Sequence, residues 1–66
     1  MDNVGQIEKV LNEVKLRMRI DFFNRDLQSL EGGVRIVEDF IQERSLYDNL
    51  SAMETLAYGH KLLSEL

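Results

Sequence analysis

Apolar residues recur at alternating steps of three and four along almost the whole of this sequence, and no proline interrupts them. This spacing places their side chains on one face of an α-helix, which turns once every ~3.6 residues. The first such series is Val4, Ile7, Leu11, Val14 and Met18. The pattern predicts an all-α chain that forms a small helical bundle or a helical hairpin.

A second apolar series continues the same spacing, and its members are Ile20, Phe23, Leu27, Leu30, Val34, Val37 and Ile41. At about 100° per residue, this series starts on nearly the opposite side of a straight helix from the first. No glycine or proline stands between Met18 and Asn24. We therefore expect one long helix from about residue 3 to residue 30, which contacts different neighbours at its two ends. Asn3 is its expected N-cap, and Asp21 is the alternative start of a new helix.

Gly32 and Gly33 lie within the second series. Two adjacent glycines cost a helix about 1.6–2 kcal/mol relative to alanine. Either glycine is also well placed as the left-handed residue just past a helix C-terminus. A continuous helix would need another backbone packed closely over them, whereas a turn would not. We expect a turn or sharp kink here, with a continuous helix as the alternative.

The rest of the chain predicts two shorter helices. One runs from Val34 to about Arg44, and residues 45–50 form a connection. Ser51 and Glu54 have the spacing of a capping box, which predicts the start of the last helix. Its apolar stripe is expected to contain Met53, Leu56, Ala57, Leu62, Leu63 and Leu66. We expect residues 1–66 to form a single all-α domain.

The composition limits how such a chain is stabilised and what it binds. A chain of 66 residues has a marginal core, and no cysteine is present for a disulfide or a thiolate metal site. A symmetric homodimer would cover the excess apolar surface. The net charge of −4 argues against nucleic-acid binding, which normally requires a basic surface. The absence of a long apolar run or a signal-like N-terminus predicts no membrane association and a cytoplasmic location.

Few residues suggest chemistry. His60 has Ser64 one helical turn away, but a lone histidine supplies neither a catalytic triad nor a set of metal ligands. Asp39 and Glu43 are also one turn apart, yet hard metal ions require more converging oxygens. We expect no enzymatic activity, no cofactor and no metal.

Charge is distributed unevenly along the chain. Residues 1–25 carry five basic and four acidic side chains, a net charge of +1, whereas residues 26–66 carry three basic and eight acidic ones, a net charge of −5. One interpretation is that this asymmetry helps the later helices to fold back on the first. The other is an acidic surface that attracts a basic partner. The basic residues of the first helix scatter around its circumference: Lys9, Lys15, Arg17, Arg19 and Arg25.

Two adjacent phenylalanines, Phe22 and Phe23, point about 100° apart on a helix. Phe23 belongs to the second apolar series, so we expect it in the core. Phe22 is in phase with the first series, on the side that the other helices are less able to cover. The predicted partner-binding residues are therefore Val14, Met18 and Phe22.

The stretch SLEGGVRIV, residues 29–37, resembles small helical co-chaperones of type III secretion needle subunits. A capped helix follows it where the chain of such a protein would end. We expect a small non-enzymatic protein-interaction module, acting as a regulator, adaptor or chaperone through an exposed apolar helix face. The alternatives are a nucleic-acid-associated regulator that acts as a dimer, or a structural assembly subunit such as a secretion-system co-chaperone, which is the role the resemblance implies.

Overall fold

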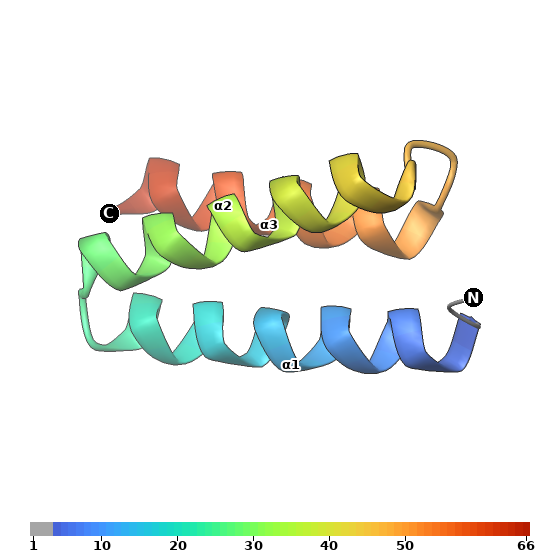
Figure 1. Cartoon of the computed structure of the whole chain (residues 1–66). Helices are drawn as coiled ribbons and strands as arrows, with labels where there is room; N and C mark the ends of the chain where they lie inside the picture. The colour runs from blue at the N-terminus through green and yellow to red at the C-terminus, as the bar shows by residue number, and fades with distance from the viewer. Residues whose placement is uncertain (1–3) are drawn as a thin grey trace.

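The computed structural model describes residues 4–66, which form a bundle of three helices (Figure 1). The helices are α1 (Val4–Phe23), α2 (Leu27–Arg44) and α3 (Leu50–Glu65). α1 and α3 run in the same direction and α2 runs in the opposite one. The C-terminal ends of α1 and α3 therefore lie at the same end of the bundle. The predicted all-α class is confirmed.

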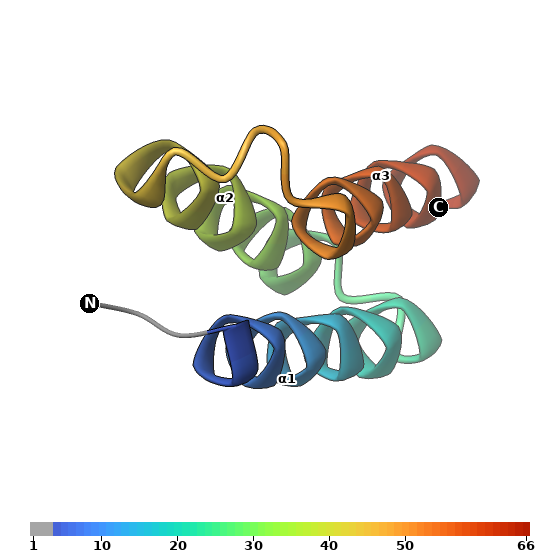
Figure 2. The same ribbon diagram turned by 90° about the vertical axis from the view of Figure 1, so that its right-hand side faces the viewer.

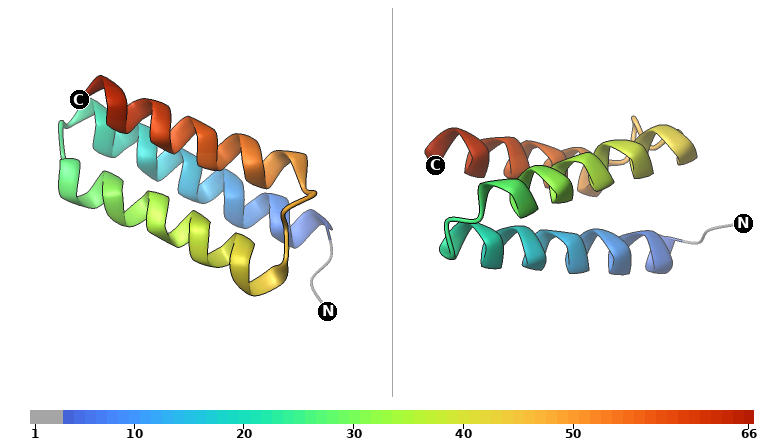
Figure 3. Two further views of the ribbon diagram at one scale, coloured as in Figure 1. Left: turned by 90° about the horizontal axis from the view of Figure 1, so that it is seen from above. Right: turned by 60° about the vertical axis from the view of Figure 1, so that its left-hand side comes forward.

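Each helix packs against the other two. The view in Figure 2 shows α2 and α3 together on one side and α1 facing them. Seen from above in Figure 3, α2 and α3 lie side by side over α1. Of the two predicted arrangements, the described residues adopt the three-helix bundle and not the hairpin.

The predicted long helix from residue 3 to residue 30 is wrong, because α1 ends at Phe23. Arg25 adopts a left-handed conformation, with φ of 57°. Its amide donates a hydrogen bond to the Phe22 carbonyl, and the Asp26 amide donates one to the Asp21 carbonyl, at 3.0 and 2.9 Å. These two bonds form a Schellman motif, which satisfies carbonyls at the end of the helix.

The residue that completes this motif also begins the next helix. The Asp26 carboxylate accepts a hydrogen bond from the Ser29 amide at 3.1 Å, so Asp26 is the N-cap of α2. A new helix therefore does start with an aspartate, but five residues after the alternative start at Asp21. The N-cap expected at Asn3 lies outside the described residues.

The turn expected at Gly32 and Gly33 is also wrong, because α2 continues through both glycines. A Cβ atom at Gly33 would lie 2.9 Å from Cγ of Met18 in α1, whereas one at Gly32 would meet open space. The close packing that a continuous helix required is therefore present at one glycine of the pair.

The core contains apolar residues from all three helices. They are Ile7, Leu11 and Met18 of α1, Leu30, Val34, Val37 and Ile41 of α2, and Ala52 and Leu62 of α3. The last four members of the second apolar series are thus buried as expected. Its first three members, Ile20, Phe23 and Leu27, are exposed because the chain changes direction between Phe23 and Leu27.

α3 begins slightly earlier than predicted. Its N-cap is Asn49, whose side-chain oxygen accepts a hydrogen bond from the Ala52 amide at 3.0 Å. The helix buries the small residues Ala52, Thr55 and Gly59, and the Thr55 hydroxyl donates to the Ser51 carbonyl at 2.8 Å. Three residues that were expected in the apolar stripe are exposed, namely Met53, Ala57 and Leu66.

Candidate functional site

The outer face of α1, defined here by Leu16, Ile20 and Phe23, exposes three large apolar side chains. Their exposed fractions are 55%, 52% and 85%. They are spaced by four and three residues, so they lie along one side of the helix. That side is about half a turn away from Ile7, Leu11 and Met18, which face the core. α1 is therefore apolar on two opposite sides of its C-terminal half.

A groove lies beside this face, between the second half of α1 and α3. The α1–α3 groove has a volume of about 430 Å³ and is lined by Leu16, Arg19, Ile20, Phe22, Phe23, Tyr58 and Leu62. Among the described residues that line it, Arg19 alone carries a charge at neutral pH. Exposed apolar surface that is rimmed by polar residues is typical of sites that bind a partner or a ligand.

Three cationic side chains contact or belong to the lining of the groove. The Lys15 ammonium lies 5.2 Å from the centre of the Tyr58 ring, and the Arg25 guanidinium lies 5.1 Å from the centre of the Phe22 ring. Arg19 lines the groove itself. Two of the three aromatic rings that line the groove, those of Phe22 and Tyr58, thus lie against a cation. The result is an apolar groove with a basic rim.

The structure separates the three predicted partner-binding residues. Met18 is fully buried and belongs to the core, so it offers no surface to a partner. Val14 is half-buried and packs against the core. Phe22 is also half-buried, but it lines the α1–α3 groove.

The expectation for the adjacent Phe23 is reversed. It was assigned to the core, yet its side chain is the most exposed of the large apolar ones between residues 4 and 66. The sequence interpretation also left out Leu16, another member of the outer face. Its signal was the spacing of Leu16 to Ile20 and Phe23, which extends the second apolar series backwards into α1.

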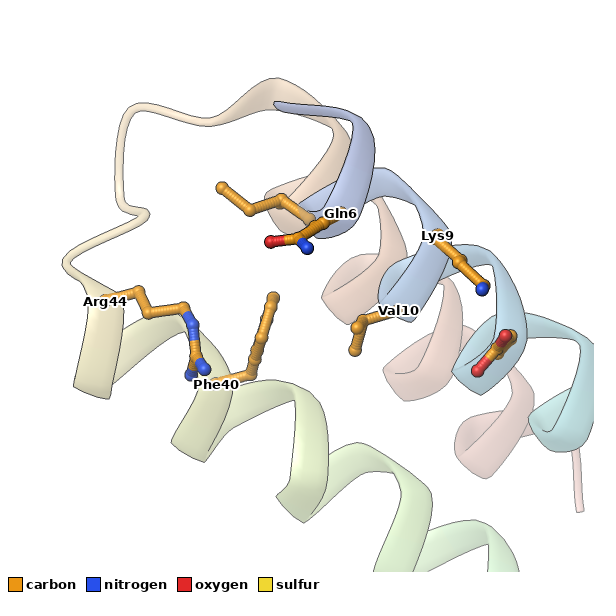
Figure 4. A pocket seen from close by; sticks show the side chains of 7 residues that line it. Gln6, Lys9, Val10, Phe40 and Arg44 are labelled. Carbon is orange, nitrogen blue, oxygen red and sulfur yellow. The ribbon is translucent and has the colours of Figure 1, made fainter. Parts of the chain in front are cut away.

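A second cleft, of about 370 Å³, lies between α1 and α2 at the other end of the bundle (Figure 4). Phe40 extends from α2 towards Val10 of α1, and the Arg44 guanidinium lies 4.4 Å from the centre of the Phe40 ring. Gln6, Lys9 and Glu13 complete the lining with Ile7. Its charges are of both signs, and Arg44 is already in contact with Glu43 at 3.6 Å. This cleft therefore has less apolar character than the α1–α3 groove.

His60 lies on the surface, where its Nε2 atom is 3.8 Å from a carboxylate oxygen of Glu38 in α2. More than half of each side chain is exposed. The Ser64 hydroxyl donates a hydrogen bond to the Lys61 carbonyl at 2.7 Å, so it is directed to the backbone and not to His60. Within residues 4–66, no group of three or more histidine, aspartate or glutamate side chains is gathered closely enough to hold a metal ion.

No protein-family model matches the chain, and no curated protein or solved structure matches it either. Across the part of the chain that the structure describes, no helix is both long enough and apolar enough to cross a membrane.

Proposed function

We propose that this chain is a non-enzymatic protein-interaction module that binds a partner protein through the α1–α3 groove and the adjoining outer face of α1. Regulators, adaptors and chaperones all act through surfaces of this kind. The observation that carries the proposal is the exposure of Leu16, Ile20 and Phe23, by 52–85%, beside an apolar groove.

Several physical features support binding at this place. Phe23 and Ile20 expose large apolar area on a helix, which is a more rigid base than a loop. The hot spots of protein interfaces are typically aromatic or arginine side chains near the centre of the contact. Phe23 and Arg19 are residues of these types, and both line the groove.

The other functions predicted from the sequence find less support in the geometry. A nucleic acid would stack its bases on exposed aromatic faces. Lys15 and Arg25 already lie over the rings of Tyr58 and Phe22, so that Phe23 alone of the described aromatic residues lining the groove is left for stacking. A structural assembly subunit would use the same apolar surface as a regulator. The homodimer expected from the sequence would also use it, so that self-association and partner binding would compete for Phe23.

Photo-crosslinking in the cell of origin tests the proposal. A photoreactive phenylalanine analogue placed at position 23 is expected to crosslink one discrete partner protein. The matched control is the same analogue at Tyr47, which is 60% exposed in the connection between α2 and α3. Equal crosslinking from both positions, or none from position 23, would contradict the proposal.

A further inference from the structure

Three cationic side chains line the α1–α3 groove or lie over rings that line it, and this restricts what fits it. Arg19 lines the groove, while Lys15 and Arg25 lie over two of its rings at 5.2 and 5.1 Å. None of the described residues that line the groove is acidic. The chain as a whole has a net charge of −4, so the sign of this basic rim is opposite to that of the net charge.

We infer that the groove binds an acidic amphipathic helix of the partner protein. Apolar side chains of that helix would enter the groove between α1 and α3, and its flanking aspartates or glutamates would face Lys15, Arg19 and Arg25. Helix-in-groove recognition uses apolar anchors at spacings of three, four and seven residues. The flanking charges would set partner choice and orientation more than affinity. This inference rests on the proposed function and specifies its partner.

A second copy of the chain fits the same surface poorly. If two α1 helices paired antiparallel with Ile20 on the twofold axis, Leu16 of each would meet Phe23 of the other. In an isologous contact, each residue near the axis approaches its own copy. Arg19, which is adjacent to Ile20, would then approach Arg19 of the second copy, and like charges in an interface are unfavourable.

An anionic membrane would also satisfy a basic apolar surface, but the remainder of the chain disfavours it. Residues 26–66 carry eight acidic and three basic side chains, a net charge of −5. In a bundle this small, those charges would lie close to a membrane that is bound at the groove. A partner helix contacts the groove and its rim alone, so it avoids most of this repulsion.

The inference is tested with two synthetic peptides of one helical design. Both carry leucine and phenylalanine at positions i, i+3 and i+7, and their flanking positions are all glutamate in one and all lysine in the other. We expect the glutamate peptide to bind at least about ten-fold more tightly, as measured by fluorescence polarisation. Amide resonances of residues that line the groove should shift on binding. Equal affinities, tighter binding of the lysine peptide, or no binding of either would overturn the inference.

Matched charge reversals locate the effect. Arg19→Glu should abolish or invert the preference for the glutamate peptide. Arg35→Glu makes the same change of charge on an exposed residue of α2 that does not line the groove, so it should change the preference by less than about two-fold. Circular dichroism should show that both variants keep their helices. If the two reversals act alike, the groove is not the site.

Other occupants give distinct outcomes in the same assay. Displacement of the glutamate peptide by single-stranded oligothymidine or by phosphatidylserine vesicles would overturn the inference in favour of a nucleic acid or a membrane. A dimer in sedimentation equilibrium that dissociates on Phe23→Ala, and that the peptide cannot displace, would show a second copy to be the occupant. If crosslinking at position 23 captures a partner through a basic or neutral segment, the inference fails while the proposed function stands.

Discussion

The two sides of α1 carry similar apolar residues, but those of one side are buried and those of the other are exposed. On the inner side, Met18 is completely buried, while five residues later on the outer side Phe23 is 85% exposed. Both are large and apolar, and both belong to one uninterrupted helix. The comparison shows that apolarity selects the residues that could be buried, whereas the positions of the neighbouring helices select those that are.

The inner side of α1 differs from the outer side because it packs against a complementary surface formed by α2 and α3. α2 and α3 present glycines where Met18 packs, and Cβ atoms at Gly33 and Gly59 would lie 2.9 Å from Met18 side-chain atoms. The Met18 side chain therefore occupies space that any other residue at these two positions would fill. The outer side has no such complement among the described residues, which leaves it available for binding.

The largest effect is expected from shortening Met18. Replacing a buried methionine by alanine typically costs 2–5 kcal/mol, and the cost rises with the cavity left behind. Glycine on both facing helices leaves little side chain that could move into the space. We expect Met18→Ala to cost about 3–5 kcal/mol, which approaches the whole stability of a small single core.

Urea unfolding followed by circular dichroism measures this loss. The control is Met53→Ala, which shortens an exposed methionine of α3. It should change the free energy of unfolding by less than about 0.5 kcal/mol. Similar losses from both substitutions would mean that Met18 has no special place in the packing.

Enlarging Gly59 tests the same contact from the opposite helix. A Cβ atom there would lie 2.8 Å from Cγ2 of Val34 and 2.9 Å from the sulfur of Met18. Overpacking costs about 1–3 kcal/mol, and alanine returns about 0.8–1 kcal/mol through its better helix propensity. The difference is a net cost of up to about 2 kcal/mol, and because two atoms lie within 3.0 Å of the added Cβ, we expect Gly59→Ala to destabilise the fold in the same assay.

A double variant makes this prediction sharper. In Met18→Ala, the methyl group added by Gly59→Ala would fill part of the cavity and would no longer clash with Met18, although its contact with Val34 would remain. The double variant should therefore be more stable than the sum of the two single losses predicts, with a coupling of about 0.5–3 kcal/mol. Strict additivity would contradict direct contact between the two positions.

Gly32→Ala should have the opposite sign to Gly59→Ala. The position lies inside α2, and a Cβ atom there would meet nothing within 4 Å. The substitution should stabilise the fold by about 0.8–1 kcal/mol, since alanine is the better helix former. The melting temperature should rise for Gly32→Ala and fall for Gly59→Ala. This difference would distinguish a glycine that only lies within a helix from one whose missing side chain is required by a neighbouring helix. Destabilisation by Gly32→Ala would indicate a turn at this position after all.

The helical content and most of the core follow from the spacing of apolar residues. That spacing alone identifies Ile7, Leu11 and Met18 on α1 as one face, and it identifies the buried face of α2 as well. These are local properties, because residues three and four apart share a side of any helix. Whether the first series would form the core or a partner-binding surface depended on which side of α1 the second helix packs against.

The connection between α1 and α2 was harder to foresee. Sequence rules place glycine in the left-handed position after a helix, but here Arg25 and Ser45 occupy such positions, and Gly32, Gly33 and Gly59 lie inside helices. The contact that makes Gly33 useful joins residues far apart in sequence, so no local pattern reveals it. One signal did exist: the two apolar series have opposite phases, which a change of direction after Phe23 reconciles.

The smallest effect on stability is expected at Phe23, on the outer side of α1. Its side chain is 85% exposed, so Phe23→Ala removes few contacts within the chain and should change the free energy of unfolding by less than about 0.5 kcal/mol. Phe22→Ala should cost more, because Phe22 packs against the core. For binding of the glutamate peptide the order should reverse, with Phe23→Ala weakening it at least about ten-fold, as expected of a central aromatic anchor. Unfolding by Phe23→Ala would show that both sides of α1 serve the fold, and the contrast between them would then carry no function.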